Sequence, residues 1–203
     1  TKLASEGKTV VYFAENEQVI GLVALMDVPN EEAMNAIHYF KSQNIETTMI
    51  TGDAKLTGEA VGRLVGVDQV FSNVLPEEKS AIVDQLKREV GMTGMVGDGI
   101  NDAPALVNAD IGVAMGDGTD IAIDVADVVV MKNDLSKLGY AHRVSKRLNK
   151  IVQQNIIFSM LVVATLIILN FLGIANIAFS VLIHEGSTLV VIFNGLRLLV
   201  NTK

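Results

Sequence analysis

The sequence predicts a doubly wound α/β fold with a parallel sheet, followed by a hairpin of two membrane-spanning helices. Between residues 47 and 131, short β-branched or apolar runs alternate with helical patterns. This alternation is typical of crossover units that cover a parallel sheet on both faces. Polar, glycine-rich clusters directly follow two of the predicted strands. The composition then changes, because residues 151–172 contain no charged side chain.

The elements follow one another along the chain. Residues 9–13 and 19–25 are β-rich and flank a polar turn, which predicts a hairpin. Asn30 is the expected N-cap of a helix whose apolar residues lie at helical spacing. Further strands are predicted at residues 47–51, 69–72, 93–96, 111–115 and 127–131. Further helices are predicted at residues 54–65, 76–90, 101–108 and 120–125.

The last third of the chain predicts membrane insertion. A basic helix at residues 135–150 leads into the uncharged residues 156–172, a run of 17 that is near the lower limit for spanning a hydrocarbon core of about 30 Å. A second apolar run, residues 174–199, is interrupted by the polar residues 184–188 and ends near Arg197. Basic residues outside both runs place residues 1–150 in the cytoplasm. Two buried helices of a soluble protein are the alternative.

Composition narrows the function further. The net charge of −7 argues against nucleic acid as a partner, which would require a basic face. The absence of cysteine excludes disulfides and thiolate metal sites within this chain. The chain has no basic-then-apolar leader and no initiating Met, so we expect a fragment of a longer polypeptide.

The first polar cluster is Thr51-Gly52-Asp53, directly after a predicted strand. Ligands of doubly wound sheets bind beyond the carboxyl ends of the strands. Gly52 lets the backbone approach a ligand closely, the Thr51 hydroxyl can hold a phosphate oxygen, and Asp53 can accept a proton or orient a water. The alternative is a strand-to-helix turn in which Asp53 only caps the helix.

The second cluster is Gly97-Asp98-Gly99-Ile100-Asn101-Asp102, after another predicted strand. Its carboxylate and amide oxygens suit Mg²⁺, a hard cation that keeps several waters. The alternative is a glycine-rich turn capped by Asn101 or Asp102. Nearby, Asp117 and Asp120 are expected to cap the next helix. Lys79 is an ordinary surface charge unless it points at a phosphoryl group.

The motifs at residues 49–53, 75–79 and 95–106 (MVGDGINDAPAL) resemble, in order and spacing, those of the P-type ATPases of the haloacid-dehalogenase-like superfamily. In that family, an Asp in a DKTGT motif takes the γ-phosphate of ATP and is then hydrolysed as a cation moves. The resemblance implies ATP as substrate and Mg²⁺ as cofactor. It assigns phosphoryl contacts to Thr51, Gly52 and Asp53, charge neutralisation to Lys79, Mg²⁺ binding to Asp98, and the rest of the phosphate and metal shell to Asn101 and Asp102.

No DKTGT occurs in this sequence, so the chain alone is expected to be inactive and to act with the remaining N-terminal part of the same polypeptide. The resemblance assigns residues 1–26 to the end of the nucleotide-binding domain and 27–135 to the phosphorylation domain. Residues 136–150 would be a linking helix and 151–203 the membrane hairpin. Asp27 matches the start of the hinge motif, although the basic residue usual three positions on is Asn30 here.

The transported ion is predicted from the hairpin. Two helices after the phosphorylation domain resemble the heavy-metal subgroup, and residues 184–188 (HEGST) resemble the HEG-x-T motif of pumps assigned to cobalt, zinc or ferrous iron. Zinc/cadmium/lead pumps typically carry Asp-x-Gly here and a Lys in the preceding helix, whereas residues 156–172 contain no Lys. Copper pumps carry Tyr-Asn in that helix, and here Asn155 follows a Gln.

An imidazole and a carboxylate suit a divalent ion of the cobalt, zinc, iron or cadmium class better than Cu⁺. Ionisable groups at membrane depth also indicate function. His184, Glu185 and Thr188 are therefore the candidate ligands of the transported cation. The alternative is that His184 and Glu185 pair or cap a broken helix. For the whole chain, a small-molecule phosphatase of the same superfamily and a catalytically silent membrane-anchored module are the alternatives.

Overall fold

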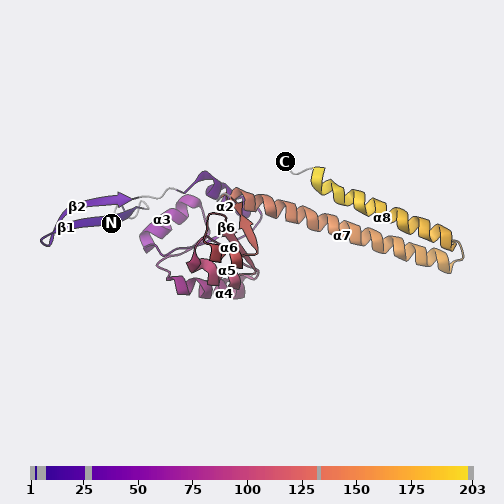
Figure 1. Ribbon diagram of the computed structural model, residues 1–203, viewed down its shortest axis with the longest axis horizontal. Coiled ribbons are helices and arrows are strands. Elements are labelled where there is room, and N and C mark those ends of the chain that lie inside the picture. Colours follow the sequence, from indigo (N-terminus) through magenta and orange to yellow (C-terminus); the bar gives the residue numbers. More distant parts are fainter. Residues whose placement is uncertain (1–2, 4–7, 26–28, 132–133, 201–203) are drawn as a thin grey trace. The chain divides into compact units, whose positions relative to one another are not determined.

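The computed structural model describes residues 3, 8–25, 29–131 and 134–200, and it divides into two compact units, Thr1–Gly139 and Tyr140–Lys203. The first unit begins with an antiparallel hairpin of β1 (Thr9–Glu15) and β2 (Gln18–Leu25), as predicted (Figure 1). Asn16 and Glu17 turn the chain with φ of 46° and 64°, the left-handed conformation of a tight hairpin turn. Asp27 lies outside the described residues.

The rest of the first unit alternates parallel strands with helices, which confirms the predicted fold class (Figure 1). The strands are β3 (Thr48–Ile50), β4 (Gln69–Phe71), β5 (Gly94–Gly97), β6 (Ile111–Met115) and β7 (Val128–Val130). The helices are α2 (Glu31–Ser42), α3 (Lys55–Val65), α4 (Lys79–Val90), α5 (Ala103–Asn108) and α6 (Asp120–Val125), with 3₁₀ turns η1 (Pro76–Glu78) before α4 and η2 (Ile100–Asp102) before α5.

The described strands pair as two parallel sheets, β3-β4 and β5-β6-β7. Within the second sheet, the middle of β6 is buried, whereas β5 alternates between exposed and half-buried residues. Parallel sheets are normally buried on both faces. By the strand order, β3 and β5 each lie at one end of a sheet, as do β4 and β7. Neither β3 nor β5 has the burial expected of a strand at the centre of a doubly wound fold.

The core of the second sheet is small and dense. Leu106, Ala114 and Ala122 are almost completely buried, and Met95, Ile123 and Ala126 pack against them. These residues come from β5, α5, β6 and α6, and Ala126 directly follows α6. The core thereby fixes the positions of the loops that leave β5 and β6.

The N-caps of α2 and α6 can be compared with the residues that the sequence predicts for them. Asn30 caps α2, because its Oδ1 accepts the amide of Ala33 at 2.8 Å. Asp117 and Asp120 were expected to cap α6, and that prediction is wrong. The cap is Thr119, whose hydroxyl accepts the amide of Ala122 at 3.4 Å. Asp120 instead lies in the first turn of α6, where a negative charge favours the helix dipole.

Aspartates just before three parallel strands fasten those strands to their neighbours. One carboxylate oxygen of Asp68 accepts the amide of Thr47 at 2.9 Å, Asp110 accepts that of Thr93 at 2.8 Å, and Asp127 accepts that of Gly112 at 2.8 Å. Lysines complete two of these contacts, Lys41 of α2 on Asp68 at 2.7 Å and Lys87 of α4 on Asp110 at 3.2 Å. These contacts hold the amino-terminal edge of the sheets.

The Asp68 contact should make stability depend on pH. Hydrogen bonds from Lys41 and Thr47 lower the pKa of Asp68 from 3.8 to about 2. A carboxyl whose pKa is lower in the folded state stabilises the fold above its unfolded pKa, and this contribution is lost as the pH falls. We therefore expect the stability difference between wild type and Asp68→Asn to be constant above pH 3.8 and to shrink towards pH 2.

Urea unfolding of both proteins across this pH range measures the difference. The matched control is Asp124→Asn, which removes an exposed carboxylate on α6. A difference between wild type and Asp68→Asn that stays constant down to pH 2 would contradict the assignment.

The second unit contains most of α7 (Ser136–Phe171) and all of α8 (Ile177–Val200), which run antiparallel side by side (Figure 1). Both are long and apolar enough to cross a membrane, and their apolar stretches are largely exposed. The predicted basic helix and first span form one continuous helix. The alternative in which residues 184–188 cap a broken helix is wrong, because α8 runs through them without a break.

Candidate functional site

The first part of the site is the turn after β3. The amide of Thr51 extends the ladder to Phe71 at 2.9 Å, which places Thr51 at the carboxyl end of the strand. The Thr51 hydroxyl donates to Asp53 Oδ2 at 2.9 Å and accepts the Asp53 amide at 3.1 Å. The exposed carboxylate of Asp53 is thus oriented by its own turn. The alternative that Asp53 caps the helix is wrong, because the N-cap of α3 is Ala54.

The second part is an ion pair between two helix starts. Glu78 accepts the amide of Leu75 at 2.9 Å and so closes the η1 turn, from which α4 begins at Lys79. Lys79 Nζ donates to Asp102 Oδ1 at 2.6 Å. The two side chains are only 19% and 10% exposed. Lys79 is therefore no ordinary surface charge.

The third part is the loop after β5, which Asp102 organises from within. Its Oδ2 accepts hydrogen bonds from the amides of Asp98 and Gly99 at 3.4 and 3.3 Å. Asp102 therefore caps the glycine-rich turn, which is the alternative that the sequence left open. A Cβ on Gly97 would lie 2.6 Å from the Asp102 Cβ, and only glycine fits there. Asp98 itself remains exposed at the tip of the loop.

A neighbouring loop fixes Asp98 from the other side. The Thr119 amide donates to the Asp98 carbonyl at 2.9 Å. A Cβ on Gly118 would come within 2.6 Å of the same carbonyl oxygen, so the loop after β6 closes on Asp98 because residue 118 is glycine. Sequence reasoning missed this role of Gly118 and Thr119. A Thr just before a helical pattern is a recognisable cap signal, but nothing in the sequence links it to Asp98.

The described residues thus form two groups. Lys79 and Asp102 meet directly, with the Asp98 loop around them, and Asn101 lies exposed in η2. Thr51, Gly52 and Asp53 form their own turn, and no described hydrogen bond or ion pair links it to the first group. The free oxygens of Asp98 and Asn101 suit Mg²⁺, which is often bound by one or two carboxylates together with waters and phosphate oxygens.

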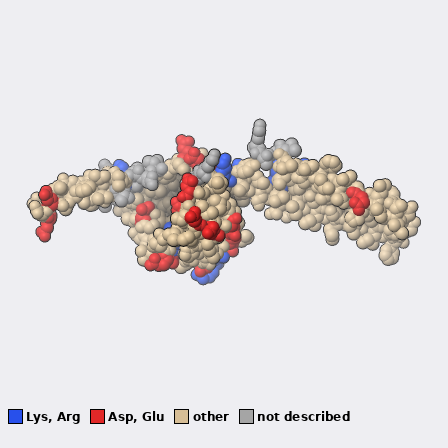
Figure 2. Space-filling model, viewed as in Figure 1, with Lys and Arg blue, Asp and Glu red and all other residues tan. Residues whose placement is uncertain are grey.

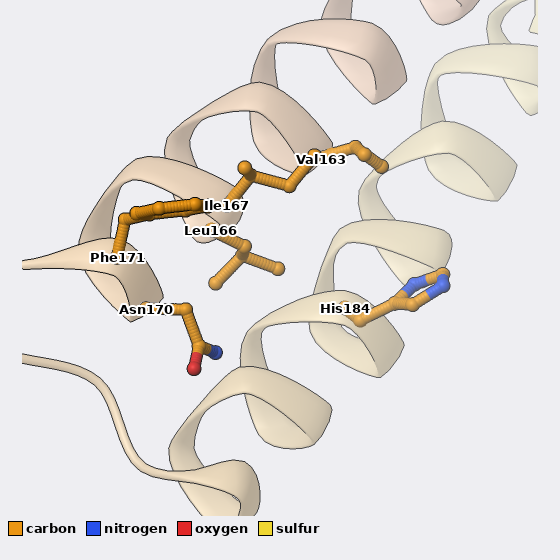
Figure 3. Close-up of a pocket in the computed structure, with 6 residues that line it drawn as sticks. All are labelled: Val163, Leu166, Ile167, Asn170, Phe171 and His184. Atoms are coloured by element: carbon orange, nitrogen blue, oxygen red, sulfur yellow. The ribbon is translucent and has the colours of Figure 1, made fainter. Parts of the chain in front are cut away.

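The predicted cation ligands lie on α8. His184, Glu185 and Thr188 are exposed, and the hydroxyls of Ser187 and Thr188 donate to the His184 carbonyl at 2.6 and 3.3 Å. Figure 3 shows the hollow that His184 lines with α7 residues, and its imidazole points away from the labelled α7 side chains. Among the described residues, no three His, Asp or Glu side chains gather into a metal site.

Residues 1–110 match the family model described as haloacid dehalogenase-like hydrolase. The chain is 46% identical to the zinc-transporting ATPase of Bacillus subtilis over 95% of its own length and 30% of the relative's. It is 41% identical to the cadmium, zinc and cobalt-transporting ATPase of the same organism, over 94% of its length and 28% of the relative's.

A crystal structure of a zinc-transporting PIB-type ATPase in the E2·Pi state superposes with a TM-score of 0.88 at 34% identity. That match covers 98% of this chain and 32% of the other. The chain therefore spans about a third of the length of the proteins it matches.

Proposed function

We propose that this chain, which belongs to the haloacid dehalogenase-like hydrolase family, supplies part of an ATP-driven pump for divalent heavy-metal ions. The motif resemblance to heavy-metal P-type ATPases agrees with relatives that transport zinc, cadmium or cobalt. The observation that carries the proposal is that one chain holds both the Lys79–Asp102 pair beside the glycine-rich loop after β5 and an apolar hairpin long enough to cross a membrane. A soluble small-molecule phosphatase would have no use for that hairpin.

The split sheet supports a role within a longer polypeptide. β3 and β5 each leave one edge without a partner among the described strands, and an unpaired edge is a template for another strand. The half-sites follow these two strands, at Thr51 and at Asp98. A strand added between them would place its carboxyl end between the half-sites. We propose that this strand carries the phosphorylated aspartate, since no DKTGT occurs in the chain.

We propose a role for each site residue, and the geometry supports these roles. Asp98, at the loop tip, is placed to hold Mg²⁺, which would neutralise phosphate charge, and Asn101 adds an amide oxygen nearby. Asp102 holds the ammonium of Lys79 close to that loop, so the lysine can neutralise charge on a phosphoryl group. Thr51 and Gly52 would contact the phosphoryl oxygens. Asp53, oriented by Thr51, would position the attacking water. Phosphoryl transfer depends mainly on such positioning and charge neutralisation.

The transported ion is proposed from α8. His184 and Glu185 are adjacent on the helix, and Thr188 lies one turn from His184. Imidazole and carboxylate suit zinc, cadmium, cobalt or ferrous iron. Because no described cluster of three ligands exists here, the remaining ligands would come from parts of the polypeptide outside this chain. We propose that the hairpin crosses the bilayer with these residues inside it and that the first unit lies in the cytoplasm.

Substitution of the α8 residues in the longer polypeptide tests this proposal. We expect His184→Ala and Glu185→Gln each to lower metal-stimulated ATP hydrolysis by about tenfold or more, because losing even a second-shell partner costs roughly 10- to 100-fold in metal affinity. The measurement is ATP hydrolysis against zinc, cadmium, cobalt and ferrous iron in turn.

The control is Leu182→Ala, which shortens an exposed apolar side chain on α8 and should leave the stimulation unchanged. Wild-type stimulation by all four metals in both test variants would remove His184 and Glu185 from the transport site. ATP hydrolysis that no metal stimulates, even in wild type, would contradict the pump itself.

A further inference from the structure

A stripe of basic side chains occupies the first half of α7. Arg143, Lys146 and Lys150 are exposed and lie three or four positions apart, so they share one face of the helix. In Figure 2, the surface of the hairpin is mostly uncharged, and its blue side chains lie toward one end. The sequence of α7 contains no Asp or Glu. The charged side chains of α7 are therefore all positive.

The stripe lies where the helix would leave a bilayer. Residues 151–171 follow Lys150 directly and span roughly 31 Å at about 1.5 Å per residue, close to the thickness of a hydrocarbon core. Lys150 would then lie at the boundary of the core. Arg143 lies about 10 Å farther along the axis, which is about one Debye length at moderate salt. All three charges are therefore within reach of lipid headgroups.

Two further arginines at this end are engaged within the hairpin. Arg147 donates to the carbonyl of Arg197 at 2.9 Å, and Arg197 donates to Asn194 Oδ1 at 2.8 Å. Asn194 in turn donates to Asn155 Oδ1 at 2.9 Å. This network joins the end of α8 to α7 beside the stripe. It thereby fixes which face of α7 turns away from α8.

Helix α8 adds little negative charge to the second unit. Glu185 is the one Asp or Glu in the α8 sequence, and it lies 12 positions from Arg197, roughly 18 Å along the helix. In the sequence, residues 140–203 hold six Lys or Arg and one Asp or Glu, a net charge of +5 in a chain of net charge −7. The positive charge is therefore concentrated in the unit that carries the apolar hairpin.

We infer that Arg143, Lys146 and Lys150 form a binding site for the headgroups of anionic phospholipids in the leaflet that faces the first unit's compartment. The inference rests on the proposed membrane insertion of the hairpin. Charge complementarity favours this occupant, because clusters of Lys and Arg beside a membrane helix attract anionic lipid. Guanidinium and ammonium groups also form charge-assisted hydrogen bonds with phosphate oxygens. Anionic lipid bound there would anchor α7 at a fixed depth.

The test embeds the chain in nanodiscs of equimolar phosphatidylglycerol and phosphatidylcholine. Native mass spectrometry of the released protein then gives the ratio of phosphatidylglycerol to phosphatidylcholine that stays bound. Each basic residue near an anionic surface is worth about fivefold in affinity. We therefore expect Arg143→Gln/Lys146→Gln/Lys150→Gln to lower the ratio by roughly tenfold or more. High salt in the nanodisc sample should lower the wild-type ratio in the same direction.

Two matched triple variants separate charge at the stripe from other effects. Lys55→Gln/Arg63→Gln/Arg88→Gln removes three exposed positive charges from the first unit and should leave the ratio unchanged. Arg143→Lys/Lys146→Arg/Lys150→Arg keeps the charge and should keep most of the selectivity. Circular dichroism checks that every variant retains its helices.

Each outcome bears on one inference. A wild-type chain that inserts into neutral nanodiscs but prefers neither lipid overturns the headgroup site and leaves the membrane hairpin standing. A stripe variant with the wild-type ratio also overturns the site, as does an equal loss in the control variant. A chain that does not insert into either bilayer overturns the membrane hairpin itself.

Discussion

Replacing Asp98 by asparagine in the longer polypeptide is expected to lower Mg²⁺-dependent formation of the aspartyl phosphate by about 100-fold or more. The reason is electrostatic, because a neutral amide is a much poorer ligand for a hard dication than a carboxylate. The loop should keep its shape. What holds it to its neighbour is the Asp98 backbone carbonyl, which accepts the Thr119 amide at 2.9 Å.

The measurement is the label incorporated from γ-labelled ATP across a series of Mg²⁺ concentrations. The loss should be largest at limiting Mg²⁺ and should shrink as Mg²⁺ rises. Asp120→Asn is the control, since it removes an exposed carboxylate from the first turn of α6 and should behave as wild type. Normal phosphorylation of Asp98→Asn at limiting Mg²⁺ would rule out Asp98 as the ligand.

The sequence was most informative where local rules decide the structure. Strand β6 and helix α6 coincide with their predicted limits, residues 111–115 and 120–125. Asn30 caps α2 as predicted. Alternating apolar runs and capping residues act within a few positions, so a single sequence carries their signal.

Pairing between strands could not be predicted with the same certainty. The sequence predicts parallel strands, but which strands meet depends on neighbours that are far away in the chain. The described strands form sheets of two and three, and none of them pairs with the open edges of β3 and β5. An aspartate stands directly before each of β4, β6 and β7, and its carboxylate accepts an amide at the start of the neighbouring strand. This recurring residue was a sequence signal for the strand pairs that form.

The site was predictable by residue type and only partly by role. The structure places the polar residues Thr51 and Asp98 directly after β3 and β5, as the sequence predicts, and their functional roles stay predictions. The partner of Lys79 is Asp102, which lies 23 positions away in the sequence. Helix and strand periodicity relates only residues a few positions apart, so it could not predict this pair. Asp102 therefore looked like a second metal ligand, although one of its oxygens holds Lys79 and the other faces two amides.

The Lys79–Asp102 pair should also carry stability that can be measured in this chain without the rest of the polypeptide. Breaking a buried ion pair leaves an uncompensated charge and typically costs about 3–5 kcal/mol. Both side chains keep some contact with water, at 19% and 10% exposure. We therefore expect Asp102→Asn to destabilise the first unit by about 2–4 kcal/mol.

Amide hydrogen exchange of β6 reports this loss locally, because the buried β6 residues open only when the core around Leu106 opens. This readout excludes the stability of the membrane hairpin. The control is Lys55→Met, which breaks an exposed pair with Glu59 at 3.9 Å and should cost at most about 0.5 kcal/mol. Equal protection in Asp102→Asn and the control would show that the pair adds no stability.

A double substitution separates the pair from its two members. Lys79→Met removes the cation and leaves Asp102 with only its two longer amide contacts, so it should destabilise as well. Lys79→Met/Asp102→Asn buries neither a lone cation nor a lone carboxylate, and its cost should fall short of the sum by about 1–3 kcal/mol. Strict additivity would mean that the two groups act separately. A shortfall would show that Asp102 sets the position of Lys79, the charge that we propose meets the phosphoryl group.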